Sequence, residues 1–194
     1  PSHPPPPPAP FFFLMIRRPP RSTLDRSSAA SDVYKRQGLA RLSSIITLLD
    51  GITGYPKTVM EGGYLTDIRT GAGTALAARF LARRDSKTIA MIGAGRVARN
   101  QLEALCLEHE IEEVLVSTRS PGRGEDFIRR MRGVTGVPNN IQLIDDRTQA
   151  VSAADMVVCA TTSSEPVLPG NALKPGTFVV CAGAHNRNLS LIHI

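Results

Sequence analysis

The sequence has 194 residues, which is enough for one full domain and part of a second. Its formal net charge is +6, but residues 1–37 carry +4 of this and residues 38–194 only +2, so the charge gives no argument for a nucleic-acid partner. No apolar run approaches the ~18 residues that a membrane span needs, so we expect no membrane partner either.

The first 37 residues differ in kind from the rest, because they hold nine of the 15 prolines and are rich in Arg and Ser. The strings at 26–37 (RSSAASDVYKRQ) and 189–194 (LSLIHI) resemble translated sequencing-adaptor read-through. We therefore expect residues 1–37 to be non-native or disordered, and residues 189–194 to be a non-native tail. A transit peptide is the alternative for the first segment, although its prolines disfavour an amphipathic helix.

Strands and helices are expected to alternate between residues 44 and 182. Two strands, 44–49 and 55–60, come first, and Thr66 is expected to cap a helix that runs to about Arg84. Further on we expect short apolar strands at 88–92, 114–117, 141–144, 156–160 and 177–182, and helices at 99–108, 125–131 and 148–153. This alternation predicts an α/β fold, a Rossmann-type parallel sheet with helices on both faces.

The sharpest local signal is a glycine turn at residues 93–98 (GAGRVA), directly after the strand at 88–92. Gly93 permits a tight turn, and Gly95 lets the backbone approach a pyrophosphate at the N-terminus of the following helix. An ordinary glycine loop is the alternative. The strand before the turn, the helix after it and the second strand at the right distance favour a dinucleotide site.

The end of the strand at 114–117 bears on which dinucleotide binds. An NAD site usually has an acidic residue about 20 residues after the turn, where it bonds the ribose 2′-hydroxyl. Here the strand is followed by Thr118, Arg119 and Ser120, with no acid at its tip. A guanidinium between two hydroxyl side chains suits a 2′-phosphate, so NADP(H) is favoured over NAD(H). A solvated surface arginine is the alternative.

Two further segments are hard to explain as scaffold alone: residues 65–72 (LTDIRTGA), and residues 154–166 (ADMVVCATTSSEP), a strand with a hydroxyl-rich loop. Together with the glycine turn, they resemble the ornithine cyclodeaminase/mu-crystallin family across most of residues 38–184. The resemblance implies a Rossmann domain at 85–188 and, at 38–84, a remnant of a smaller α+β substrate and dimerisation domain with its connecting helix. It also implies that the parent protein is a homodimer.

The resemblance assigns roles to individual residues. Arg69 matches the arginine that holds the substrate carboxylate, Thr70 would lie near the cofactor phosphates, and the loop at 161–163 would line the nicotinamide side. The expected cofactor-binding residues are Thr70, Gly93, Ala94, Gly95, Arg96, Val97, Thr118, Arg119, Ser120, Thr161, Thr162 and Ser163.

General physical arguments support two of these roles. A cation near a helix start is disfavoured by the helix dipole, which suggests an anionic partner for Arg69; an ion pair with Asp67 or Glu61 is the alternative. The loop at 161–163 follows the carboxyl end of a parallel strand, where ligands bind in such sheets. A capped turn is the alternative there, since Thr and Ser commonly cap helices.

The sequence departs from the family pattern in two places. Ornithine cyclodeaminases carry an Asp after the last Rossmann strand, and His185 stands at or near its place here, as a candidate proton-transfer group or as an incidental loop residue. The Lys and Arg that complete the family's site come from N-terminal sequence that is absent. We therefore expect this chain, as a fragment, not to turn over substrate.

These observations predict an NAD(P)-dependent oxidoreductase, which moves a hydride between the nicotinamide and the amine-bearing carbon of a small amino acid or imine. The parent would be a dehydrogenase, a ketimine reductase or a cyclodeaminase. A non-catalytic protein that binds NADP(H) and a small ligand, like the mu-crystallins, is the alternative. The separated Cys106, Cys159 and Cys181 predict reduced, buried thiols in a cytoplasmic protein, with no disulfide framework and no metal site.

Overall fold

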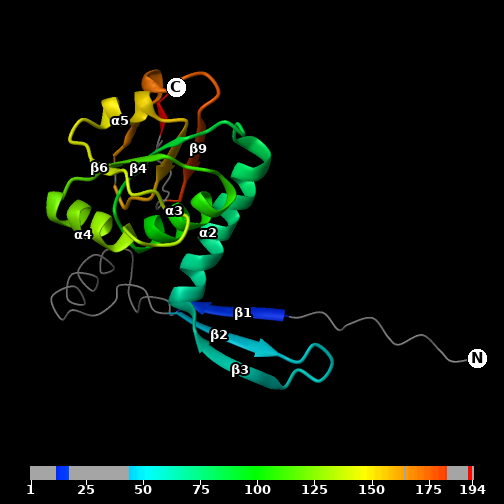
Figure 1. Ribbon diagram of the computed structural model, residues 1–194. Coiled ribbons are helices and arrows are strands. Elements are labelled where there is room, and N and C mark those ends of the chain that lie inside the picture. Colours follow the sequence, from blue (N-terminus) through cyan, green and yellow to red (C-terminus); the bar gives the residue numbers. More distant parts are fainter. Residues whose placement is uncertain (1–11, 18–43, 164, 183–191, 194) are drawn as a thin grey trace, which may run out of the picture. The chain divides into compact units, whose positions relative to one another are not determined.

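The computed structural model describes residues 12–17, 44–163, 165–182 and 192–193 (Figure 1). The chain forms two compact units, Pro1–Thr66 and Asp67–Ile194. The boundary lies within helix α2 (Gly62–Leu81) and not after residue 84, where the sequence analysis placed it. The physical reason is that α2 beyond Thr66 packs closely on the helix that follows the glycine turn, as described below.

The described part of the first unit is an antiparallel sheet of β1 (Phe12–Arg17), β2 (Ser44–Leu49) and β3 (Pro56–Glu61), in that order. Strand β1 lies in the segment that we expected to be non-native or disordered. The β2–β3 turn is fixed by Asp50, whose Oδ1 accepts hydrogen bonds of 2.9 Å from the N–H groups of Ile52 and Thr53. The ammonium of Lys57, 2.8 Å from Oδ2, and these N–H groups lower the pKa of Asp50.

Helix α2 starts four residues earlier than the predicted cap at Thr66. The carboxylate of Glu61 accepts hydrogen bonds from the N–H groups of Gly63 (2.6 Å) and Tyr64 (3.1 Å), so Glu61 satisfies the first turn. The predicted start was wrong because the Glu61 side chain caps the helix at Gly62, ahead of Thr66.

The second unit is built on a parallel sheet with the order β6-β5-β4-β7-β9. Its strands are β4 (Thr88–Ile92), β5 (Glu113–Ser117), β6 (Ile141–Leu143), β7 (Met156–Cys159) and β9 (Phe178–Cys181). The chain begins this sheet in its centre, at β4, and the order reverses between β4 and β7. The predicted Rossmann-type α/β fold is therefore confirmed.

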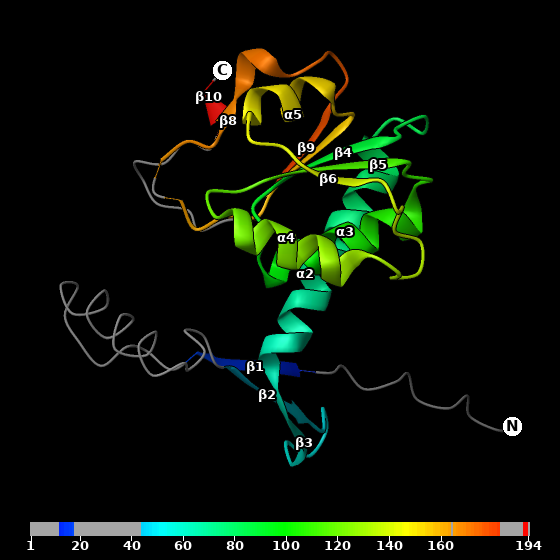
Figure 2. The ribbon, with the colours of Figure 1, turned by 60° about the vertical axis from the view of Figure 1, so that its left-hand side comes forward.

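Helices cover both faces of this sheet (Figure 2). Helices α2, α3 (Arg96–Glu108) and α4 (Pro121–Met131) pack on one face, and α5 (Arg147–Ala153) packs on the other. Alternate residues of β4 serve the two faces: Ile89 and Met91 meet the first group, while Ala90 and Ile92 meet α5. Burial on both sides explains why the strands are continuous apolar runs.

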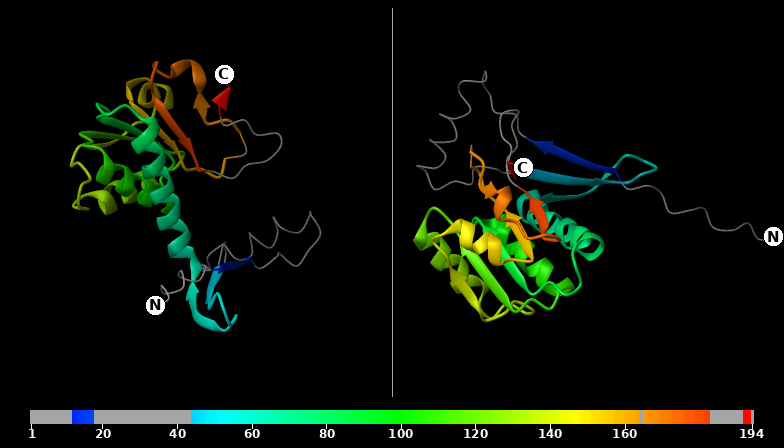
Figure 3. Two further views of the ribbon diagram at one scale, coloured as in Figure 1. Left: turned by 90° about the vertical axis from the view of Figure 1, so that its right-hand side faces the viewer. Right: turned by 90° about the horizontal axis from the view of Figure 1, so that it is seen from above.

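Strand β9 forms one edge of the sheet, and Figure 3 shows it from two further sides. Beyond α5, a short strand β8 (Leu168–Pro169) and a 3₁₀ turn (Gly170–Ala172) add to the second face, and β8 pairs in parallel with β10 (Ile192–His193). In the described ranges, no helix combines the length and the apolar character that crossing a membrane requires.

Candidate functional site

The carboxyl ends of three neighbouring strands surround a cavity of about 490 Å³ in the second unit. In the register of the sheet, Ile92 at the end of β4 stands between Ser117 of β5 and Cys159 of β7. The loops that leave these ends therefore meet at one edge. They are the glycine turn, the segment after β5 and the segment after β7, and all three line the cavity.

The glycine turn takes the geometry that its sequence suggested. Gly93 has a φ of 105°, a left-handed conformation that favours glycine, and its N–H donates to the carbonyl of Ser117 at 2.9 Å. A Cβ at Gly93 would lie 2.4 Å from the carbonyl oxygen of Ala160. The loops after β4 and β7 can therefore come this close only because residue 93 has no side chain. Gly95 has open space where its Cβ would be, on a turn that lines the cavity.

Two helix N-termini open at this edge without a side-chain cap. Gly95, the N-cap of α3, has no side chain, and Ser120, the N-cap of α4, makes no side-chain hydrogen bond to the free N–H groups of its helix. Uncapped N–H groups and the positive ends of two helix dipoles favour an anion. The site can therefore hold phosphate groups on backbone donors.

The segment after β5 brings positive charge to the cavity. Thr118, Arg119 and Ser120 all line it, as the sequence analysis expected, and Arg119 is exposed. Arg123, the third residue of α4, also lines it. Sequence reasoning missed Arg123 because it began α4 at residue 125. Pro121 after a serine is typical of a first helical position and gives the signal that finds it.

A third arginine, Arg147, and two acids, Asp126 and Glu165, also line the cavity. Arg147, at the start of α5, donates from Nη1 to the carbonyl of Val167 at 3.2 Å, so it ties α5 to the chain after β7. Asp126 accepts from Nε of Arg130 at 2.7 Å and also pairs with Arg129, and the Arg130 guanidinium holds the pKa of this carboxyl below its usual range. No local pattern could have found Arg147, since its contact joins residues 20 apart.

The loop after β7 lines the cavity through Thr161, Thr162 and Ser163. Two of its hydroxyls also form local turns: Thr161 Oγ1 accepts from the N–H of Ser163 at 2.7 Å, and Ser163 Oγ accepts from the N–H of Glu165 at 3.2 Å. The loop is thus a turn held by its own side-chain-to-backbone hydrogen bonds, and its polar residues line the cavity together with Gly93.

The other expected site residues stand apart from this cavity. Arg96 and Val97 begin α3 but are not among the lining residues, and the same holds for Arg69 and Thr70 on α2. Arg69 is exposed and is the eighth residue of its helix, so the premise that it lies at a helix start was wrong. The predicted role of His185 falls outside the described residues.

The thiols differ from the expectation of three buried cysteines. Cys106 and Cys159 are buried, whereas Cys181 is exposed at the end of the edge strand β9. All three are free. Among the described residues, no group of three or more potential metal ligands gathers.

Comparison with known proteins gives the class that this fold and cavity define. Residues 29–192 match the ornithine cyclodeaminase/mu-crystallin family, and the chain belongs to that family. The matched range includes residues 29–37 and 189–192, which the sequence analysis had set aside as non-native.

Individual relatives are enzymes by name. A Δ(1)-pyrroline-2-carboxylate reductase of Bacillus cereus is 32% identical over 155 residues, 80% of this chain and 47% of the relative. The structure of the same kind of reductase from Thermococcus litoralis, with NADH and L-proline, has a TM-score of 0.73 at 36% identity, over 77% of this chain and 46% of that one. An archaeal alanine dehydrogenase dimer with bound NAD has a TM-score of 0.68 at 30% identity, over 75% of this chain and 44% of that one. This chain spans just under half the length of these relatives.

Proposed function

We propose that this chain is the dinucleotide-binding part of an NAD(P)-dependent oxidoreductase that acts on an amino acid or the corresponding imine. The observation that carries the proposal is the cavity at the carboxyl edge of β4, where Gly93 and Gly95 precede the uncapped N-terminus of α3. A pyrophosphate fits this cradle because the backbone offers free N–H donors and no side chain fills the space at Gly95.

The bound nicotinamide would supply the redox chemistry, by accepting or donating a hydride at the carbon that bears the nitrogen. The protein's part is to orient the cofactor along the edge. The adenosine end would lie toward Arg119, two residues after the end of β5, and the nicotinamide end toward the Thr161–Ser163 turn after β7. The turn after β7 and the glycine turn after β4 border the reversal point of the sheet, which is where open α/β sheets bind ligands.

We propose further that the cofactor is NADP(H) in preference to NAD(H). Arg119 follows β5 and Arg123 lies in the first turn of α4, and both line the cavity with Thr118 and Ser120. Among the described residues, neither arginine forms an ion pair. Asp126 lies at the same place, but Arg129 and Arg130 already hold its carboxylate. A 2′-phosphate would find charged donors here and little repulsion. The two solved relatives are described with NADH and with NAD, so the proposed preference for NADP(H) would distinguish this chain from them.

The substrate proposal rests on the relatives and on Arg69. The Thermococcus reductase is described with L-proline and the archaeal enzyme as an alanine dehydrogenase, so an α-amino acid or its imine is the shared chemistry. Arg69, exposed on α2, is the residue we propose to hold the carboxylate. A dimeric parent is proposed from the archaeal relative, which is described as a dimer.

Calorimetric titration of NADPH and NADH into the 194-residue chain tests the cofactor proposal. NADPH should bind more tightly than NADH, and Arg119→Ala should weaken NADPH binding by about 10- to 100-fold, because a charge-assisted hydrogen bond contributes about 1.5–3 kcal/mol. NADH binding should change less than about twofold. Arg132→Ala is the matched control, since Arg132 is exposed at the end of α4 and does not line the cavity.

Two results would overturn parts of this proposal. Equal affinity for both nucleotides, unaffected by Arg119→Ala, would remove the 2′-phosphate assignment and leave the nucleotide site. A folded chain that binds neither nucleotide would remove the site itself. In a protein of the relatives' full length, oxidation of NADPH on addition of a cyclic imine would separate an oxidoreductase from a mu-crystallin-like binding protein.

A further inference from the structure

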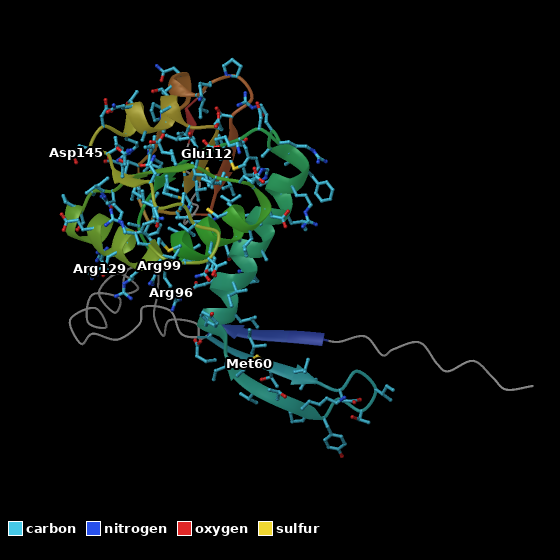
Figure 4. All side chains as sticks on the ribbon, in the orientation of Figure 1. Met60, Arg96, Arg99, Glu112, Arg129 and Asp145 are labelled. Carbon is cyan, nitrogen blue, oxygen red and sulfur yellow. The ribbon has the colours of Figure 1, made fainter. Side chains whose placement is uncertain are left out.

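A buried carboxylate on α2 pairs with the first residue of α3. Asp67 is only 1% exposed, and Nε of Arg96 lies 2.5 Å from its Oδ2. Arg96, which is labelled in Figure 4, directly follows Gly95. The ion pair is therefore attached to the turn that lines the cavity. The sequence analysis placed Arg96 among the cofactor-binding residues. Its side chain pairs with Asp67 of α2, and its expected role in cofactor binding stays a prediction.

The same two helices touch along their length. A Cβ at Gly71 would lie 2.4 Å from the carbonyl oxygen of Asn100, so the backbones approach closely at that level. Further along, the buried Gln101 donates from Nε2 to Oγ1 of Thr74 at 2.9 Å. These contacts hold α2 and α3 in one register.

A second ion pair closes the far end of this interface. Arg79 of α2 donates from Nε to Oε2 of Glu108 at 2.8 Å, and from Nη2 to the other oxygen. Both side chains are more exposed than Asp67, and the pair lies at the C-terminal end of α3. The interface therefore has two ion pairs on the same two helices, and only the first lies beside the glycine turn.

The electrostatic setting of Asp67 is unusual for a carboxylate beside an anion site. A buried charge is costly without a partner, and a bare carboxylate near bound phosphates would repel them. Arg96 removes both problems, because it neutralises Asp67 and its own backbone belongs to the first turn of α3. The pair can thus fix the direction in which the free N–H groups of that turn point.

We propose that Asp67 is a positioning residue for the phosphate-binding turn, and that it acts through Arg96; this rests on the proposed function of the glycine turn as a dinucleotide site. Asp67 orients the first turn of α3 and touches neither cofactor nor substrate. The pair also holds α2, two residues before Arg69, in register with the cofactor cradle.

For Asp67→Asn, a simple charge effect predicts a change in nucleotide affinity that is opposite to the change expected from a positioning role. If charge alone mattered, Asp67→Asn would remove a negative charge near the phosphates and would leave nucleotide affinity equal or higher. If Asp67 positions the turn, the same variant weakens binding although the local charge has become more favourable. Asp67→Asn therefore separates the two explanations.

The test is a double-mutant cycle on the 194-residue chain, with the dissociation constants of NADPH and NADH measured by calorimetry well below the unfolding temperature. Asp67→Asn and Arg96→Gln should each weaken binding of both nucleotides by about five- to twentyfold, and the double variant should lose no more than one single variant. Arg96→Lys, which keeps a cation within reach of Asp67, should restore most of the affinity.

Glu108→Gln is the matched control, because it breaks the other α2–α3 ion pair at the far end of the helix. It should lower the unfolding temperature slightly and leave nucleotide affinity within about twofold. Equal losses in Glu108→Gln and Asp67→Asn would overturn the proposal in favour of general helix docking.

Unchanged or tighter binding by Asp67→Asn would overturn it as well. If Asp67→Asn does not fold, Arg96→Gln and Arg96→Lys decide, because Arg96 is half exposed and both variants keep the helix. An unaltered affinity in Arg96→Gln then refutes the proposal. Failure of the unmodified chain to bind either nucleotide would instead refute the proposed function, so the two failures are distinguishable.

Discussion

The two edges of the same parallel sheet are built in opposite ways. At the amino edge, polar groups satisfy one another: the carboxylate of Asp155 accepts from the N–H groups of Lys87 (2.9 Å) and Thr88 (3.1 Å) and from Arg83 (3.0 Å). At the carboxyl edge, α3 and α4 begin without side-chain caps, and two exposed arginines form no ion pair with any described residue. At the amino edge the polar groups bond one another, whereas at the carboxyl edge the first N–H groups of α3 and α4 have no side-chain partner, as the proposed nucleotide site requires.

This difference predicts that the two edges of the sheet can be altered separately, one with an effect on stability and the other with an effect on nucleotide binding. Substitutions at the amino edge should change the free energy of unfolding and leave nucleotide affinity alone. Substitutions at the carboxyl edge should do the reverse, except where a loop there also holds the strands together. The glycine turn contains both kinds of residue: substitution of Gly93 should affect folding and binding, and substitution of Gly95 should affect binding alone.

The largest effect is expected from Gly93→Ala. The φ of 105° and the 2.4 Å approach of a Cβ to the Ala160 carbonyl mean that the strand loops must move apart. We expect a loss of about 1–3 kcal/mol in the free energy of unfolding, together with loss of nucleotide binding. Urea unfolding and calorimetry of the same sample measure both. A variant with unchanged stability would show that the turn is less constrained than its geometry indicates.

Gly95→Val is the companion change, which should separate binding from folding. A Cβ at Gly95 meets no atom within 4 Å, and its φ of −90° is open to any residue. The unfolding temperature should stay within about 2 °C, while nucleotide affinity falls by about tenfold or more because the side chain occupies the path of the pyrophosphate. Normal binding by this variant would place the phosphates elsewhere.

The opposite edge should respond to Asp155→Asn. Burial by itself raises the pKa of Asp155, but the N–H groups of Lys87 and Thr88 and the ammonium of Lys174 outweigh it, so the pKa is lowered. A lowered carboxyl pKa contributes stability above the unfolded value of about 4, and that contribution is lost as the pH falls through the folded value. The variant should be less stable by about 1–3 kcal/mol near neutral pH, with the difference shrinking below about pH 4.

Urea midpoints at about pH 7 and about pH 3 would measure this effect. Asp85→Asn is the control, because Asp85 is 78% exposed and lies 3.4 Å from the same Arg83. It should change stability by less than about 0.5 kcal/mol. An Asp155→Asn variant with impaired nucleotide binding would contradict the separation of the two edges.

The smallest predicted effect concerns the thiols at the ends of β7 and β9. Cys159 and Cys181 are register partners, and a hydrogen bond from the Cys159 thiol lowers the pKa of the exposed Cys181 to about 7. Burial raises the pKa of Cys106 to about 12. Iodoacetamide at neutral pH should therefore alkylate Cys181 at least about tenfold faster than Cys106, as followed by peptide mass spectrometry.

Cys159→Ala removes the donor, so the pKa of Cys181 should rise and its alkylation should slow by a few-fold while it stays exposed. Alkylation of Cys106 before Cys181 would contradict the prediction that Cys181 is the more reactive thiol. The alkylation rate of Cys181 also tests the comparison of the two edges, because it measures solvent access to the carboxyl edge in the absence of nucleotide.

Local sequence was enough to predict the parts of the protein that depend on short windows. The apolar runs, the turn at 93–98 and the hydroxyl-rich ends of β5 and β7 predicted a parallel sheet with a dinucleotide cavity, and the fold is confirmed. Parallel strands end at one edge, so the loops at 118–120 and 161–163 had to meet there. Those residues line the cavity, and their binding roles stay predictions.

Only the tertiary structure decided the contacts between distant segments. The pairing of Asp67 with Arg96 depends on how two helices dock, and the hydrogen bond from Arg147 to the carbonyl of Val167 joins residues 20 apart. The exposure of Cys181 follows from its place on an edge strand. Periodicity and turn chemistry are encoded within a few residues, whereas a side chain's partner depends on packing across the whole unit, which no single window contains.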